Sequence, residues 1–333
     1  MGSSLQFAPS EAVVEIDPDA DLDTSQVEDL RDSSGDGGGG FGGGRMALGG
    51  GGLGLVILVI YLLLSHGGGG STGGSQSGLG GLNGLPEIGG GPSSVQQGEA
   101  AERLKQKCAT GQSATALDCE AVAFINSIQN YWTTQLARSG TPYRPVSTIF
   151  FTNSVSTGCG EASSDTGPFY CPADKKVYID LSFYKELETR FGTQGGLFPR
   201  AYVLAHEYGH HVQDLLGTEQ RVRTRSGPNS DSVKLELQAD CYAGVWANHA
   251  TQTRTASGKP LIENITAEDK KAGLDTASRI GDDFIQTHLG SGRVNKNQFT
   301  HGSSAQREKW LTVGLTTGNP AQCDTFSPGV NLG

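Results

Sequence analysis

The chain has 333 residues, 35 acidic and 25 basic side chains, a net charge of −10 at pH 7 and 50 glycines. The charge is uneven: residues 1–45 hold ten acids and two bases, a balance of −8, which leaves −2 of the −10 for everything that follows. A nearly neutral remainder without a basic patch argues against nucleic acid as a partner.

The first hundred residues contain 28 of the 50 glycines, too many for a compact core. We predict a disordered, acidic, cytoplasmic tail over residues 1–45. Residues 46–65 are predicted to form a transmembrane helix, because an uncharged helix of this length spans roughly 28 Å; a buried core helix is the alternative. Residues 66–98 are predicted to be a Gly/Ser-rich linker. Arg45 precedes the apolar stretch, so the positive-inside rule places the N-terminus in the cytoplasm and the remainder outside.

Residues 99–333 are predicted to form one folded domain of the α+β class, mainly helical with a small sheet. Helical patterning covers 101–107 and 118–136, and strands are expected over 145–152 and 175–182. The second helix carries an apolar stripe that we interpret as core. Its members are Val122, Ile125, Ile128, Trp132 and Leu136.

Residues 205–211 contain a His-Glu-x-x-His pattern. On a helix, positions i and i+4 are about 40° apart, so His206 and His210 face a common point that can hold a metal. Glu207 is rotated by about 100° and lies beside that point, where its carboxylate can take a proton from water. The pattern predicts two metal ligands and one general base.

Neighbouring residues favour a helix here. Pro199 suits a first turn and Gly217 suits a left-handed stop. Gly209 costs about 1 kcal/mol against alanine inside a helix, so we interpret it as room for close backbone packing. His211 is rotated by about 140° from His206 and is expected to pack or hydrogen-bond rather than bind metal.

A catalytic zinc usually has three protein ligands and an open position. A third histidine six residues after His210 is missing, because that position is Leu216. Glu236 and Asp240, which share one face of a predicted buried helix, are the next candidates. One carboxylate can bind the metal while the other accepts a hydrogen bond from a ligand histidine, here His206.

The six cysteines are even in number and lack a Cys-x-x-Cys pair, which favours disulfides outside the cytoplasm over a zinc-cysteine site. Fifteen connectivities exist for six cysteines. We predict pairing of neighbours: Cys108 with Cys119, Cys159 with Cys171, and Cys241 with Cys323. Further along, Thr266–Asp269 has the pattern of a capping box that opens a helix toward Leu289.

The His206-Glu207-x-x-His210 and Glu236-x-x-Ala239-Asp240 motifs resemble the gluzincin arrangement of zinc peptidases. The surrounding sequence resembles the bacterial family of putative neutral zinc metallopeptidases. The segments that carry this resemblance are 168–174, 178–180, 206–213 and 301–304. The resemblance covers roughly residues 100–325. It implies a zincin-like metallopeptidase domain that binds Zn²⁺ through His206, His210 and Glu236, with Asp240 supporting a ligand histidine.

By similarity to a late histidine and arginine pair of membrane-embedded gluzincins, His301 is a candidate oxyanion donor and Arg307 its companion; a purely structural role is the alternative for each. Because zinc peptidases align substrates along an edge strand, the strand over 175–182 is a candidate for that role, with an interior strand as the alternative.

The expected function is membrane-anchored hydrolysis of peptide or protein substrates near the membrane surface, with Glu207 as the base. A zinc-stabilised binding or scaffold module without activity, and a metal amidase that acts on cell-wall peptides, are the other readings.

Overall fold

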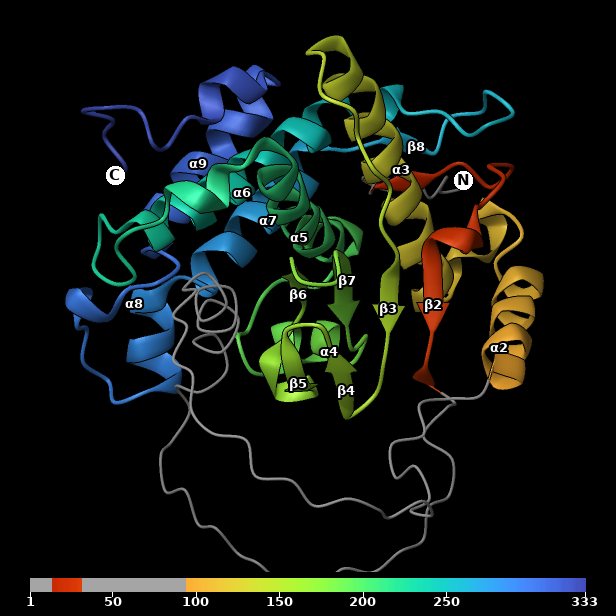
Figure 1. Ribbon diagram of the computed structural model, residues 1–333, viewed down its shortest axis with the longest axis horizontal. Helices are drawn as coiled ribbons and strands as arrows, with labels where there is room; N and C mark the ends of the chain where they lie inside the picture. The colour runs from red at the N-terminus through yellow and green to blue at the C-terminus, as the bar shows by residue number, and fades with distance from the viewer. Residues whose placement is uncertain (1–13, 32–93) are drawn as a thin grey trace, which may run out of the picture.

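The computed structural model describes residues 14–31 and 94–333, which form a mixed α and β fold that is mainly helical with small sheets. Helix α5 lies at the centre, with α3 on one side and α6 on the other (Figure 1). The α-helices are α2 (Ser94–Lys107), α3 (Leu117–Arg138), α4 (Phe183–Thr189), α5 (Leu197–Leu216), α6 (Asp231–His249), α7 (Ala267–Arg279), α8 (Asp282–Phe284) and α9 (Ser304–Thr317).

The main sheet has four strands in the order β2-β3-β7-β6. Strands β2, β3 and β7 are parallel, and β6 runs antiparallel to β7 at one edge. Two further pairs, β4 with β5 and β1 with β8, are antiparallel. The strands are β1 (Glu15–Ile16), β2 (Val27–Asp29), β3 (Thr148–Phe150), β4 (Ser154–Thr157), β5 (Gly160–Ser163), β6 (Phe169–Cys171), β7 (Lys176–Ile179) and β8 (Ile262–Asn264).

Both strands expected after the first long helix are present, but one of them has a different place in the sheet. Strand β7 falls within 175–182 and lies between β3 and β6, so the expectation that it is an edge strand is wrong. The edge strand on this side is β6, because β7 is its one partner in the sheet. Sheet order depends on pairing between distant segments, which alternation within one strand does not report.

The N-terminal stretch also differs from expectation. A disordered tail was predicted over residues 1–45, yet residues 14–31 form β1, a 3₁₀ turn and β2 and join the folded domain. Val14, Ala20, Leu22 and Val27 are buried in the main core. These apolar contacts offset the cost of ordering an acidic stretch.

The predicted transmembrane helix 46–65 and most of the predicted linker 66–98 lie outside the described residues. The linker prediction extends slightly too far, because α2 already begins at Ser94. Within residues 14–31 and 94–333, none of the helices has the length and apolar character needed to cross a bilayer.

The core surrounds α3, α5 and α6. All five members of the predicted apolar stripe of α3 are buried, which confirms their assignment to the core. The three predicted disulfides are also present: Cys108–Cys119, Cys159–Cys171 and Cys241–Cys323. The last of them fastens the C-terminal 3₁₀ helix η9 (Pro320–Cys323) to α6.

The helix predicted to run from Thr266 toward Leu289 begins as expected but is interrupted. Thr266 and Asp269 form the capping box that opens α7. Helix α7 ends at Arg279, and α8 and a π-helical turn over Ile285–Leu289 follow. Gly281 stands at the break, where a Cβ would lie 2.4 Å from the backbone nitrogen of Ser304, so only glycine allows the chain to pass this close to the start of α9.

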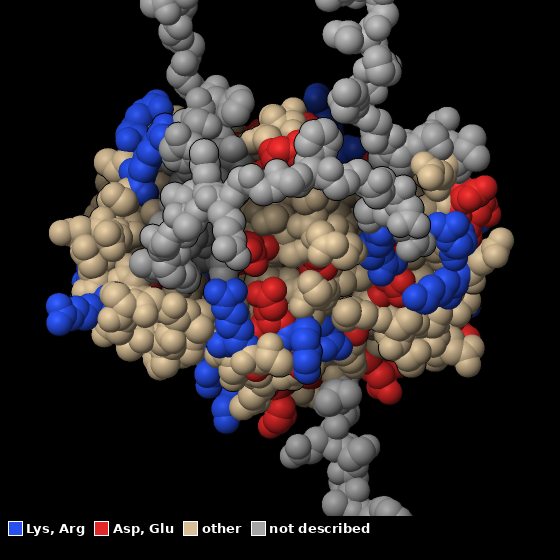
Figure 2. All heavy atoms as spheres, turned by 90° about the horizontal axis from the view of Figure 1, so that it is seen from below, with Lys and Arg blue, Asp and Glu red and all other residues tan. Residues whose placement is uncertain are grey.

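Acidic and basic side chains are interspersed on the described surface seen in Figure 2. No single sign dominates this face of the described region. The mixture agrees with the nearly neutral charge balance of the sequence after Arg45.

Candidate active site

Helix α5 presents the His-Glu-x-x-His motif as predicted. Pro199 lies in its first turn, and Gly217 ends it in the left-handed region with φ 69°, donating its N–H to the carbonyl of Asp214. Every residue from Ala201 to Gln213 is buried. The motif is therefore held on a rigid central element with little exposure to solvent.

Helix α6 packs directly against the motif and begins at a cap in which Ser230 accepts the backbone N–H of Val233. Gly209 makes the close packing possible: a Cβ there would lie 3.0 Å from the Cα of Ala239 and 3.1 Å from its carbonyl oxygen. This confirms the interpretation of Gly209 as a packing glycine. The close approach brings the side chains of the two helices to one place.

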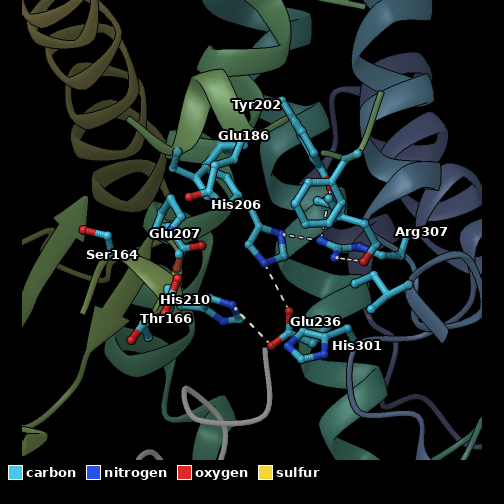
Figure 3. A pocket seen from close by; sticks show the side chains of 18 residues that line it. Ser164, Thr166, Glu186, Tyr202, His206, Glu207, His210, Glu236, His301 and Arg307 are labelled. Atoms are coloured by element: carbon cyan, nitrogen blue, oxygen red, sulfur yellow. Dashed lines mark hydrogen bonds and ion pairs between the residues drawn. The ribbon is translucent and has the colours of Figure 1, made fainter. Parts of the chain in front are cut away.

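That place is a cluster of two imidazoles and a carboxylate (Figure 3). The Nε2 atom of His206 lies 3.1 Å from one oxygen of Glu236, and the Nε2 atom of His210 lies 3.5 Å from the other. One donor atom from each of the three residues lies within 4.8 Å of the others, and all three are buried. The structure thus brings together the three residues predicted as metal ligands.

Each imidazole is oriented by a partner at its other nitrogen. Asp240 Oδ1 lies 2.8 Å from His206 Nδ1, as predicted, and Gln213 Oε1 lies 2.8 Å from His210 Nδ1. A carboxylate or amide oxygen only accepts, so both Nδ1 atoms carry a proton and both Nε2 atoms keep their lone pair for the cluster. The arrangement fits a divalent cation held by two neutral imidazoles and one carboxylate.

The role of Gln213 was not predicted from the sequence. Its amide nitrogen donates to the carbonyl of Leu235 at 2.7 Å and to Gln238 at 3.1 Å, both on α6. Gln213 therefore fixes His210 and at the same time joins α5 to α6. The sequence did contain a signal for this contact, because side chains three residues apart on a helix are neighbours.

Charge on the cluster is set by burial and neighbours. Burial opposes the charged imidazole, but Asp240 and Glu236 outweigh it and raise the pKa of His206 to about 10. Burial also opposes ionisation of Glu236, yet His210 and His301 hold its pKa well below the ordinary value. Both shifts have one cause, which is that the two carboxylates favour positive charge at the cluster. A divalent cation would supply that charge in place of the second imidazole proton, so its binding would release the proton and leave the ligand imidazoles neutral.

A buried network continues behind His206. Arg307 donates to both oxygens of Asp240 at 2.9 Å and to the hydroxyl of Tyr202 at 3.2 Å, and Tyr202 donates to Asp240 at 2.6 Å. Burial alone would raise the pKa of Asp240, but Arg307 and His206 lower it to about 2. Arg307 thus has the structural ion pair that was its alternative reading, and it supports Asp240 behind a candidate ligand.

Glu207 lies beside the cluster rather than within it. Its side chain lines the pocket, and burial raises its pKa, opposed by the two neighbouring histidines and by a hydrogen bond from the backbone N–H of Tyr170. A raised pKa suits a group that takes up and releases a proton near neutral pH. The position agrees with the predicted base.

His301 lines the same pocket from the loop before α9. Asp282 organises this loop: one of its oxygens accepts the backbone N–H groups of Thr300, His301 and Gly302 at 2.8 to 2.9 Å. Its other oxygen lies 3.5 Å from His301 Nδ1. Asp282 was not foreseen, because no local pattern connects it to a loop eighteen residues later.

His211 points away from the cluster. Its ring contacts the hydroxyl of Tyr170 at 3.1 Å and the carbonyl of Arg144 at 2.8 Å. The expectation that it packs and hydrogen-bonds is confirmed. A second group of potential ligands, Cys108, Asp118 and Cys119, is not a metal site, since both sulfurs are joined in a disulfide.

The cluster opens into a pocket. Beyond the polar residues already described, much of its wall is apolar. The apolar members are Phe183, Phe191, Val203, Ile280 and Ile285. The segment Ser164–Pro168, which leads into the edge strand β6, forms another part of the wall.

Two packed helices that join a His-Glu-x-x-His motif to a downstream glutamate define the class of zinc-metallopeptidase-like proteins. Within this class, the family model described as "Putative neutral zinc metallopeptidase" matches residues 20–326, and the chain belongs to that family. Membership implies Zn²⁺ as the metal of the cluster.

Curated relatives extend over the same region. The chain is 46% identical to the uncharacterized protein Rv2575 of Mycobacterium tuberculosis over 224 residues, which are 66% of this chain and 75% of the relative. It is 41% identical to the uncharacterized protein YpfJ of Escherichia coli K12 over 221 residues, 63% of this chain and 73% of the relative. No solved structure shows a significant match.

Proposed function

We propose that the protein is a membrane-anchored zinc-dependent peptidase. The strongest support is that His206, His210 and Glu236 converge at the wall of an open pocket. The carboxylate of Glu207 lies beside them and is not part of the ligand cluster. A structural zinc site is closed by a fourth protein ligand and has no use for a buried base. In the described residues only three candidate ligands meet here.

When bound, zinc supplies Lewis acidity that activates a water and polarises the scissile carbonyl. Glu207 accepts the proton of that water and returns it to the departing amine. The backbone N–H of Tyr170 keeps the Glu207 carboxylate in place between these two tasks. Asp240 and Gln213 hold the two ligand imidazoles in the tautomer that leaves Nε2 free.

His301 is proposed to stabilise the oxyanion that forms when the carbonyl is attacked. Its side chain faces the pocket next to Glu236. The hydroxyl of Thr300 lies 2.8 Å from its Nδ1 and can donate to it, which leaves the ring proton on Nε2 for the oxyanion. Hydrogen-bond donors of this kind contribute about 3 kcal/mol to catalysis in other hydrolases.

The substrate is proposed to be a peptide or protein with a bulky apolar side chain next to the scissile bond, since the wall formed by Phe183, Val203 and Ile285 is apolar. Its backbone would extend along β6. Val177 of β7 donates its N–H toward β3, whereas Tyr170 of β6 donates toward Glu207, so the free edge of β6 faces the site. Peptides methylated at backbone nitrogens should therefore bind more weakly than unmodified ones.

The decisive experiment replaces Glu207 with Gln. Zinc content, measured on the purified protein, should stay near one ion per chain, while cleavage of peptide libraries should be lost. An active Glu207→Gln variant would refute the assigned base. A zinc-loaded wild-type protein that cleaves no peptide but binds some would support a binding module, and cleavage restricted to cell-wall peptides would support an amidase.

The peptidase domain is proposed to work outside the cytoplasm, close to the membrane surface. Its three disulfides support the compartment, because such bonds persist in oxidising environments. The apolar stretch 46–65 in the sequence supports attachment to a membrane. Substrates would then be proteins or peptides that come near that surface.

A further inference from the structure

Residues 14–31 and 94–333, which lie before and after the apolar stretch 46–65 in the sequence, fold together. We propose that residues 14–31 lie on the same side of the membrane as the active site, in the same oxidising compartment. The proposal rests on the membrane attachment in the proposed function, and it revises the expectation of a cytoplasmic N-terminal segment.

The first support is the strand pairing of the N-terminal segment. Strand β2 pairs in parallel with β3 along its whole length, Val27 with Thr148, Glu28 with Ile149 and Asp29 with Phe150. It thereby becomes the outer strand of the main sheet, and it lies beside α2 in Figure 1. Strand β1 pairs with β8, on a different part of the domain.

Specific polar contacts accompany the strand pairing. The side chain of Asn126 on α3 accepts the backbone N–H of Asp23 at 2.8 Å and donates to its carbonyl at 2.9 Å. This two-way pairing satisfies the side-chain amide of Asn126, which is buried. Lower on the same helix, Gln129 donates to Gln26 at 2.9 Å.

Ion pairs hold β2 at its middle residue and just beyond its C-terminal end. Arg31 donates to Asp118 at the start of α3 at 3.0 Å, and Lys176 of β7 donates to Glu28 at 3.1 Å. Asp118 is 4% exposed and also accepts from Lys107. If the N-terminal segment lay in another compartment, the Asp118 carboxylate would lose Arg31. Among the described residues, its remaining cationic partner would then be Lys107, which is exposed.

The loop closed by the disulfide Cys108–Cys119 provides the tightest fit. Within it, Gly111 donates its backbone N–H to Ala20 at 2.8 Å, and Gln112 donates to Pro18 at 2.8 Å. A Cβ on Gly111 would lie only 1.9 Å from the carbonyl oxygen of Asp17. Gly111 thus leaves space that the N-terminal segment fills. The segment packs against the loop that the disulfide Cys108–Cys119 closes.

A single crossing conflicts with this packing. A helix that spans the bilayer once places the residues before it and after it on opposite faces. The contacts of residues 14–31 with α3, β3 and the disulfide loop require both on one face. The family model matches from residue 20, so residues 20–31 of this segment lie within the family match.

Cysteine labelling in a bacterial host tests the placement without any need for activity. All six native cysteines are paired, so an introduced cysteine is the only free thiol of the chain. Ser25→Cys reports on the N-terminal segment, and Glu161→Cys on β5 reports on the peptidase domain; both positions are exposed. Full-length variants are treated with a membrane-impermeant maleimide in spheroplasts, before and after permeabilisation.

We expect both cysteines to react to the same extent in intact spheroplasts. Reaction of Ser25→Cys only after permeabilisation would overturn the proposal and restore a single crossing. Protection of both cysteines in intact spheroplasts would overturn the assignment to the oxidising compartment. Because no cleavage is measured, these results are independent of whether the protein proves to be a peptidase.

A second experiment tests the docking itself in the purified full-length chain. Gly111→Ala should increase hydrogen exchange at least tenfold in peptides from residues 14–31 and leave α5 protected. Gly98→Ala is the matched control, because its Cβ would have nothing within 4 Å. Unchanged exchange in Gly111→Ala would show that the segment is not held in this position and would overturn the proposal.

Discussion

Replacing Arg307 with Met should destabilise the protein strongly although Arg307 touches neither the ligand atoms of the cluster nor bulk solvent. The side chain is 3% exposed, and it pairs with an Asp240 that is fully buried. Removing one partner of a buried ion pair leaves an uncompensated charge and costs about 3–5 kcal/mol. For a domain of this size, each kcal/mol lowers the melting temperature by about 2–4 °C, so the loss should be roughly 6–20 °C.

The double variant Arg307→Met, Asp240→Asn separates stability from metal binding. Removing both charges should recover part of the lost stability, because no buried charge remains unpaired. Zinc affinity should stay at least about tenfold weaker, since His206 has lost its carboxylate. Thermal unfolding and zinc competition titration measure the two quantities.

Lys185→Met is the control, since it removes a 3.8 Å ion pair with Glu188 in which the lysine side chain is 74% exposed, and it should change stability by less than about 1 kcal/mol. A loss in Arg307→Met no larger than in this control would refute the role assigned to the buried pair. Equal zinc affinity in the double variant and the wild type would refute the role assigned to Asp240.

Three other substitutions address individual contacts. Gln213→Leu should weaken zinc binding about 10- to 100-fold in a competition titration, because His210 loses the acceptor for its Nδ1–H; unchanged affinity would exclude this role. Asp282→Asn should lower kcat at constant zinc content, because the loop that carries His301 loses its carboxylate, and a matching fall in His301→Ala kinetics would place both in one unit. Val203→Phe should raise KM for peptides with bulky apolar side chains more than for those with alanine, and an equal change for both would argue against the apolar wall as a specificity element.

The candidate ligands could be predicted because their signals are local. His206, Glu207 and His210 lie within one and a half turns of a helix, so their relative directions follow from helical geometry. Glu236 and Asp240 required one additional assumption, that a second helix packs against the first. The structure shows that Gly209 permits this packing.

Features that depend on distant partners could not be read in the same way. Residues 14–31 are acidic and short of apolar side chains, and they are ordered only because α3, β3 and the loop at Gly111 supply their partners. The rank of β7 in its sheet likewise depends on β2 and β3 pairing on one side and β6 on the other. Asp282 meets His301 only through the fold of the chain between them.

The distance between the candidate metal ligands of α5 and α6 depends on the absence of a side chain at Gly209. Because α5 and α6 touch at Gly209 and Ala239, a single methyl group at position 209 would force the helices apart by a few tenths of an ångström. His206 and His210 would then move away from Glu236, although none of the three had changed. The geometry of the candidate metal site thus depends on the contact between α5 and α6 at Gly209 and Ala239, neither of which lines the pocket.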